Sequence, residues 1–161
     1  MTPTRKLTYA GILTAIAVLG GVLSFPALGS RCAPVQHLVN ILCAVLLGPF
    51  WSVGVAFAAS LLRNIAGLGS LMAFPGSMIG ALCCGIAYHC TQRIGITCLA
   101  EALGTGILGA LVAYPVAAVL MGLNPASYTV YILPFLISTG VGSAAAFFLL
   151  RFLLPQMGWR H

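Results

Sequence analysis

Acidic residues are almost absent from this sequence, and charged residues of any kind are scarce. Glu101 is the only Asp or Glu among 161 residues, and charged residues make up 5% of the chain. Hydrophobic residues make up 61%. Soluble domains have a far higher share of charge and a lower share of apolar residues. The composition therefore predicts one integral membrane domain over residues 1–161.

Motifs for hydrolytic chemistry are also absent. The chain contains no Gly-x-x-x-x-Gly-Lys-Ser/Thr, no His-Glu-x-x-His and no Gly-x-Ser-x-Gly sequence. Its six cysteines form no pair of Cys-x-x-Cys motifs and lie mostly in apolar runs, which favours free hydrophobic cysteines over a metal site. We therefore expect neither enzymatic activity nor a metal or cofactor in this chain.

Six apolar segments predict six transmembrane helices. Several of them are at or below the roughly 20 residues that cross a bilayer, so tilted helices and broken ends are expected. The predicted spans are 7–25, 34–48, 52–66, 75–91, 96–121 and 128–154. The result is an all-α membrane bundle, and Pro115 is expected to kink the fifth span.

The basic residues stand singly at the ends of these spans, which indicates a role in orientation rather than nucleic-acid binding. Six spans place both termini on one side of the membrane. That side would hold five basic residues, and the other side would hold two: Arg5, Lys6, Arg93, Arg151 and Arg160 against Arg31 and Arg63. The positive-inside rule then predicts cytoplasmic termini and a multi-pass protein of the cell membrane.

The run 63–77 interrupts the apolar chain with a charge, an amide, three glycines and a proline. Glycine weakens helices and Pro75 disfavours a helical Phe74, so the run predicts a helix end, a structured loop and a new helix. The loop is either a plain connection or a lid over a pocket. The predicted lid residues are Gly67, Gly69, Ser70, Met72 and Gly76.

Polar residues at the starts of two spans suggest what such a lid would cover. Gln36, His37 and Asn40 fall within one helical turn, and Arg63 and Asn64 stand where the third span meets the loop. These side chains either form a ligand pocket or hold helices together through structural hydrogen bonds. Sequence alone leaves both readings open.

Glu101 is expected to need a partner, because a charged carboxylate in a bilayer is costly unless it is paired or hydrogen-bonded. Arg63 has a long side chain and approaches from the opposite side, so we predict that it meets Glu101 beneath the lid. The alternative is that Glu101 binds the ligand directly.

The first span carries a face of small residues that permits close contact with another helix. Ala10, Thr14, Ala17 and Gly21 follow the spacing i, i+4, i+7 and i+11, with Gly11 and Ala15 beside them. This face either docks a partner protein or packs inside the same molecule.

Several strings in order along residues 34–111 carry a resemblance: PVQHLVN, LLGP, LLRNIAGLGSLMAFPGSMIGAL and EALGTGILGAL. The chain resembles ThiW, the thiazole-related substrate-binding (S) component of energy-coupling factor (ECF) transporters. The resemblance implies a six-helix S component that captures hydroxyethylthiazole, a thiamine precursor. It also implies a T component and two cytoplasmic ATPases as partners, which would use the ATP. In related S components, helix 1 contacts the T component, and loops 1 and 3 close over the substrate.

A pocket for hydroxyethylthiazole needs an aromatic floor and a few hydrogen-bonding groups. Phe74, Tyr114, Tyr128 or Tyr131 could supply the floor, and Gln36, His37, Asn40, Asn64 and Glu101 the polar contacts. The alternative function is a self-sufficient proton-coupled small-molecule transporter that uses Glu101 as its titratable acid.

Overall fold

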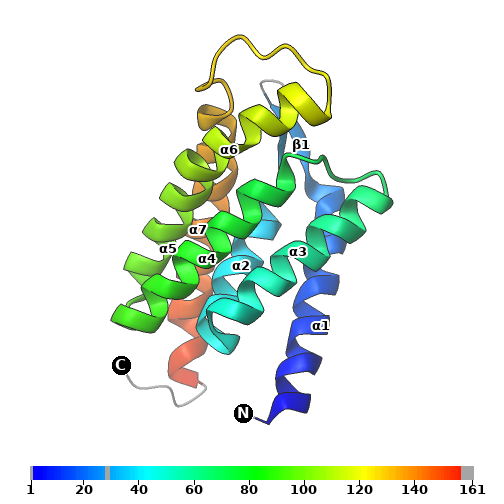
Figure 1. Ribbon diagram of the computed structural model, residues 1–161. Helices are drawn as coiled ribbons and strands as arrows, with labels where there is room; N and C mark the ends of the chain where they lie inside the picture. Colours follow the sequence, from blue (N-terminus) through cyan, green and yellow to red (C-terminus); the bar gives the residue numbers. More distant parts are fainter. Residues whose placement is uncertain (1, 28–29, 157–161) are drawn as a thin grey trace.

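The protein is a bundle of helices with one short β-hairpin (Figure 1). The computed structural model describes residues 2–27 and 30–156. Its helical elements are α1 (Pro3–Leu19), the 3-10 turn η1 (Gly20–Leu23), α2 (Pro34–Leu47), α3 (Pro49–Ile65), α4 (Ala73–Thr91), α5 (Ile94–Leu103), the π-helical η2 (Gly104–Gly109), α6 (Ala110–Pro115), the π-helical η3 (Val116–Leu120) and α7 (Ile132–Gln156). Strands β1 (Phe25–Ala27) and β2 (Ser30–Cys32) pair antiparallel between η1 and α2. The predicted all-α class is confirmed.

Successive helices alternate in direction through the bundle (Figure 1). The start of α1, the α2–α3 and α4–α5 turns and the end of α7 lie at one end. The hairpin, the α3–α4 loop and the α6–α7 connection lie at the opposite end, here called the hairpin end. Arg31 in β2 and Arg63 in the last turn of α3 belong to the hairpin end. Arg160, which entered the predicted charge count, lies outside the described residues.

Four helical segments are long and apolar enough to cross a bilayer: Pro3–Leu23, Ala73–Thr91, Ile94–Leu120 and Ile132–Pro155. Helices α2 and α3 are shorter, at 14 and 17 residues. Helix α2 compensates by its central position, since it contacts α1, α3, α4 and α7 and ten of its residues are buried. Buried polar groups on α2 are therefore shielded from lipid by the other helices.

The first predicted span extended too far. Helix α1 ends at Leu19 because Gly20 and Gly21 begin a 3-10 turn, and Phe25 already belongs to β1. A Cβ at Gly20 would collide with Val35, so the missing side chain lets η1 lie directly against α2. The hairpin was not predicted.

The last predicted span began too early. Helix α7 starts at Ile132, whereas the prediction started it at Tyr128. Tyr128 lies in the preceding connection, with its ring stacked on Tyr114 at a centroid distance of 3.8 Å. This stack holds the connection between η3 and α7 against α6, and the residues around Tyr128 do not extend α7.

The α2–α3 turn lies at residue 48, where the second predicted span ends. Gly48 has a φ of +93°, a left-handed value that glycine adopts without strain. Pro49 is the first residue of α3, where a missing N–H costs nothing. Helix α3 therefore begins three residues before the predicted start of the third span.

Candidate ligand-binding site

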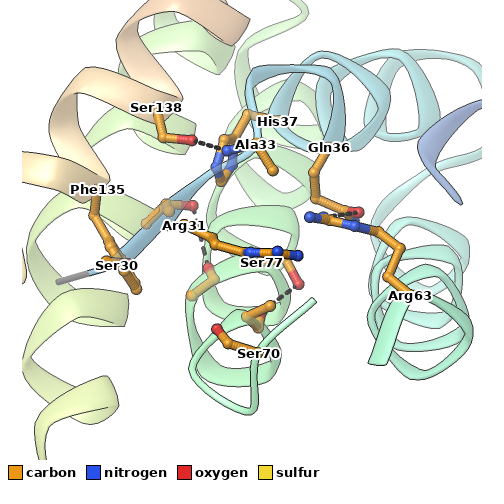
Figure 2. A pocket seen from close by; sticks show the side chains of 13 residues that line it. Ser30, Arg31, Ala33, Gln36, His37, Arg63, Ser70, Ser77, Phe135 and Ser138 are labelled. Atoms are coloured by element: carbon orange, nitrogen blue, oxygen red, sulfur yellow. Dashed lines mark hydrogen bonds between the residues drawn. The ribbon is translucent and has the colours of Figure 1, made fainter. Parts of the chain in front are cut away.

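A small cavity at the hairpin end lies among α2, α3, α4, α7 and the hairpin (Figure 2). Its volume is about 40 Å³, which has room for only about three water molecules. Side chains of both arginines of this end, several hydroxyl groups and one aromatic ring line it. The full lining is Ser30, Arg31, Ala33, Gln36, His37, Arg63, Ser70, Ala73, Gly76, Ser77, Thr105, Phe135 and Ser138.

Beneath this cavity, Glu101 is completely buried among hydrogen-bond donors. Its Oε1 lies 2.9 Å from His37 Nδ1 and 3.0 Å from Asn40 Nδ2, which donates to it. Thr105 Oγ1 lies 3.1 Å from the same oxygen and 3.2 Å from the Gly76 carbonyl, and its single proton can serve only one of them. His37 also lines the cavity, so its imidazole links the Glu101 carboxylate to the cavity.

The small size of Gly80 makes room for this carboxylate. A Cβ there would collide with Thr105 Oγ1 and would lie 2.7 and 2.8 Å from the two Glu101 oxygens. The continuous segment Ile94–Leu120 comprises α5, η2, α6 and η3 and is here called the fifth helical segment. Helix α4 thus brings a bare backbone against this segment at the level of Glu101. Glu101 Oε2 has no hydrogen-bond partner in the described part of the chain.

The prediction that Arg63 pairs with Glu101 is wrong. Arg63 Nη1 donates to Gln36 Oε1 at 3.3 Å, and Nη2 donates to the Leu68 carbonyl at 3.4 Å. Within residues 2–27 and 30–156, the basic side chain that lies at contact distance from Glu101 is His37, at 2.9 Å. Helix α2 lies between the two residues, and its polar face supplies a separate partner to each.

The cavity is covered by two segments that are joined by a hydrogen bond. Arg31 in the hairpin donates from Nη1 to the carbonyl oxygen of Gly67, at 3.2 Å. Gly67 belongs to the loop 66–72, and Ser70 of the same loop lines the cavity. The hairpin and the loop therefore form one cover over the cavity, and the role of the loop as a lid stays a prediction.

Asn64 supports this cover rather than lining the cavity. Its Nδ2 donates to the Ser60 carbonyl at 2.8 Å and to the Ser70 carbonyl at 3.1 Å. Gly69 lies directly against it, so a Cβ there would be 3.0 Å from the Asn64 amide nitrogen. The predicted role of Asn64 as a direct ligand contact is replaced by an anchoring role.

Two predicted lid residues differ from the expectation: Gly76 is helical, and Met72, the last residue of the loop 66–72, packs into the apolar core. Helix α4 begins at Ala73, so Gly76 lies within the helix and lines the cavity from its floor. Phe74 is helical too, because Pro75 falls in the first turn, where its missing N–H is tolerated. Met72 is buried in an apolar cluster with Ala110 and the rings near the start of α7.

The predicted aromatic floor is also corrected. Phe74 packs against Phe57 at a centroid distance of 5.7 Å, and Tyr114 stacks on Tyr128. Tyr131 is buried beside Phe135, and of these rings only Phe135 reaches the cavity. Phe135 follows Tyr131, the residue just before α7, by four residues, and this helical spacing, which places both side chains on one face, could have identified Phe135.

Ser138 continues this face of α7 by a further turn. Its Oγ accepts a hydrogen bond from the backbone N–H of Ala33 at 2.8 Å, and Cys32 Sγ contacts the Pro134 carbonyl at 3.2 Å. The base of the hairpin is thereby attached to α7. Other lining residues missed by the sequence reasoning are Ser30, Arg31, Ala33, Ala73, Ser77 and Thr105.

The small-residue face of α1 is mostly turned into the molecule. Ala10 and Ala17 are buried in the main apolar core, and a Cβ at Gly21 would lie 2.8 Å from Arg63 Nε. Thr14 is half-buried and donates to the Ala10 carbonyl. Ala10, Ala17 and Gly21 thus follow the alternative of packing inside the molecule, and docking of a partner on this face stays a prediction. Gly11 and Ala15 are exposed.

A second hollow, of about 230 Å³, lies at the opposite end beside the α2–α3 turn. It is more open and is lined mainly by small residues and turn residues, including Gly48, Pro49 and Gly85, with Tyr88, His89 and Gln92 at its side. No arginine or acid lines it. The cavity at the hairpin end is the better candidate, since it collects buried charge, hydroxyl groups and one ring under a cover.

This arrangement suits the binding of a small aromatic molecule with polar groups. His37 Nδ1 bonds the Glu101 carboxylate as a donor, which leaves Nε2 to accept a hydrogen bond when the ring is neutral. Phe135 offers an apolar face, and Gln36 and Arg63 supply amide and guanidinium donors. A molecule larger than a few waters requires the cover to move.

Comparison with known proteins is consistent with this geometry. No curated protein sequence matches the chain. The model of one family, described as thiamine-precursor transporter protein (ThiW), matches residues 7–155. That match includes α2, α3, α4, the fifth helical segment and nearly all of α7. With a membrane-spanning helical bundle and a covered polar cavity at one end, this chain belongs to the ThiW family of thiamine-precursor transporters.

Proposed function

We propose that this chain is the substrate-capturing S component of an ECF importer and binds a thiazole precursor of thiamine, hydroxyethylthiazole. A T component and two ATPases would drive uptake. The family match supports a transported thiamine precursor. The absence of any nucleotide-binding motif in the sequence supports an external source of energy.

The observation that carries the proposal is the covered cavity at the hairpin end. It combines the Phe135 ring with a fixed imidazole acceptor on His37 and the Gln36 amide, a set suited to a small aromatic alcohol. The cover consists of the first and third interhelical connections, joined by Arg31. The hairpin end lies opposite the start of α1 and the end of α7, which supports capture on the side of the membrane away from these two helix ends.

Binding by the isolated chain is the direct test. The purified protein in detergent should bind hydroxyethylthiazole in isothermal titration, with a stoichiometry of one and without ATP. Uptake into proteoliposomes should require co-reconstitution with T and ATPase subunits and ATP inside the vesicle lumen that corresponds to the cytoplasm. Absence of binding to the isolated chain would refute the capture role.

One observation favours a second function, proton-coupled transport by this chain alone. Glu101 is buried inside the helical bundle and bonded to His37, which lines the cavity, so a proton acceptor is connected to the site. In liposomes that contain only this chain, such a transporter would move ligand in response to a pH gradient. The S-component proposal predicts no such transport.

A further inference from the structure

The cavity carries more positive charge than the chain can neutralise. Arg31 and Arg63 both line it, and their guanidinium groups approach it from the hairpin and from α3 (Figure 2). Glu101 is the only acidic residue in the entire sequence, and it is bonded to His37 and Asn40. No side-chain carboxylate therefore remains for either arginine.

Of the two arginines, Arg63 has the greater need for a counter-ion, because its side chain is buried. Its exposed fraction is 2%, and its only hydrogen bonds in the described part of the chain go to neutral oxygens of Gln36 and Leu68, at 3.3 and 3.4 Å. Its Nε has no partner there. Of five N–H donors, two are used, and both bonds are long. A buried charge without a counter-ion is strongly disfavoured, so this guanidinium favours an incoming anion.

Neutral donors surround the same space. Ser30 and Ser70 line the cavity from the hairpin and from the loop 66–72, and neither hydroxyl bonds another group within the described residues. Arginine forks and free hydroxyl groups are the usual partners of phosphate and carboxylate oxygens. A neutral alcohol would leave both positive charges uncompensated.

We infer that the ligand is an anion, and that Arg63 and Arg31 bind its oxyanion group, as in a phosphate monoester or a carboxylate of a small aromatic ring compound. This inference rests on the proposed function and narrows its substrate class from the thiazole alcohol to an anionic derivative. Arg31 also joins the two segments of the cover, because its side chain in the hairpin donates to the Gly67 carbonyl in the loop 66–72. An oxyanion held by Arg31 would therefore help to close the hairpin over the ligand.

Titration with three probes tests the inference: hydroxyethylthiazole, its phosphate monoester, and a thiazole carboxylate. We expect at least one anionic probe to bind about 10- to 100-fold more tightly than the alcohol, the range for one or two charge-assisted hydrogen bonds. The better of the two anions identifies the oxyanion. Its affinity should also fall with added salt more than that of the alcohol.

Variants assign the effect to the arginines. Arg63→Gln should remove most of the anion's advantage while changing the alcohol's affinity less than about 3-fold, and Arg63→Lys should restore part of it. Arg93→Gln is the control, because Arg93 is exposed at the opposite end of the bundle. Thermal unfolding of each variant shows that it remains folded. If Arg63→Gln unfolds, Arg31→Gln should still lower anion affinity selectively.

The possible results separate this inference from the proposed function. Equal or tighter binding of the alcohol than of both anions would overturn the inference and leave the proposed function intact. Binding of none of the three probes would reject both. An anion preference that survives Arg63→Gln and Arg31→Gln unchanged would show that other groups bind the anion, which also overturns the inference.

Discussion

Arg31 Nη1 lies 3.2 Å from the carbonyl oxygen of Gly67, so a side chain of the β-hairpin is hydrogen-bonded to the loop between α3 and α4. The two segments are separated by the whole of α2 and α3 in the sequence. Because the bond is exposed, it is weak enough to break and re-form during ligand entry. Opening of the cover can therefore be followed at residues of the hairpin.

Cys32, at the base of the hairpin, is a reporter for this opening. Burial raises the pKa of its thiol, so little reactive thiolate is present near pH 7–8. In a variant that retains Cys32 alone, maleimide labelling should be slow, and Arg31→Ala should accelerate it. A variant that retains only the exposed Cys90 should label quickly with or without Arg31.

The raised pKa of Cys32 also makes the stability of the folded state depend on pH. A thiol pKa that is raised in the folded state contributes stability that is present below the thiol's ordinary pKa and is lost as pH rises through the raised value. Labelling of Cys32 should therefore accelerate as pH rises above about 9, where the folded hairpin is less stable. A labelling rate that does not change over this pH range would contradict an opening of the hairpin.

Phe135 should be the aromatic contact of the ligand. Phe135→Ala should weaken binding of the best thiazole probe by roughly 10-fold or more, because ring stacking and apolar contact are both lost. Phe57→Ala removes a ring of similar size that packs outside the cavity against Phe74, and it should leave affinity unchanged. Equal losses in titrations of the two variants would mean that the effect is structural.

The Glu101–His37 pair should be energetically coupled. Glu101→Gln and His37→Gln should each destabilise the protein, and the double variant should lose less than the sum, by about 1 kcal/mol. Each single change leaves a buried polar group poorly matched. Reversible unfolding in mixed micelles measures the cycle. Glu101→Gln combined with Arg151→Gln, a residue near the end of α7, should give additive losses.

Gly80 should tolerate no side chain. Gly80→Ala would insert a methyl group against Thr105 and the Glu101 carboxylate, and overpacking of this kind costs about 1–3 kcal/mol. Gly54→Ala on α3 is the matched control, since nothing lies within 4 Å of its added Cβ. That change should be neutral or stabilising by up to about 1 kcal/mol, as expected for alanine in a helix. Similar thermal shifts for both variants would contradict the close approach at Gly80.

The exposed part of the small-residue face should dock the T component. Gly11→Leu and Ala15→Leu should prevent co-purification of the T component and ATPases, because close helix approach is lost, while ligand binding by the isolated chain stays normal. Ala17→Leu is a contrasting change, since Ala17 is buried and its replacement should reduce thermal stability instead. A complete complex with leucine at both positions 11 and 15 would exclude this surface.

Sequence patterns predicted the helical segments well because apolar runs and turn residues are local signals. The second segment ends within one residue of its predicted end, since Gly48-Pro49 combines a left-handed turn with a favourable helix start. The hairpin was missed because strands of three residues carry no alternation that can be detected. Pro75 misled the prediction for Phe74, because a proline is equally compatible with the first turn of a helix.

The partners of the polar residues depended on the rotation of each helix about its axis, which local patterns do not specify. Gln36, His37 and Asn40 were predicted as one polar face, and all three are buried on α2. Which of them meets Glu101 and which meets Arg63 follows from the way α3, α4 and the fifth helical segment pack around α2. The choice of Phe135 over its neighbouring aromatic residues has the same origin.

The π-helical turns of the fifth segment, Gly104–Gly109 and Val116–Leu120, place a constraint on how its length can change. A π turn holds an extra residue relative to an α turn, and each residue of an α-helix advances the side-chain direction by about 100°. Deleting a single residue from Gly104–Gly109 would let this turn relax to α geometry, and the buried side chains Ala110, Ala113 and Ala117 would keep their directions. Deleting a residue from an α-helical turn of the same segment would instead rotate every later side chain by about 100° relative to Glu101. Insertions and deletions in this segment are therefore limited by the phase of the helix, even where every individual side chain is small.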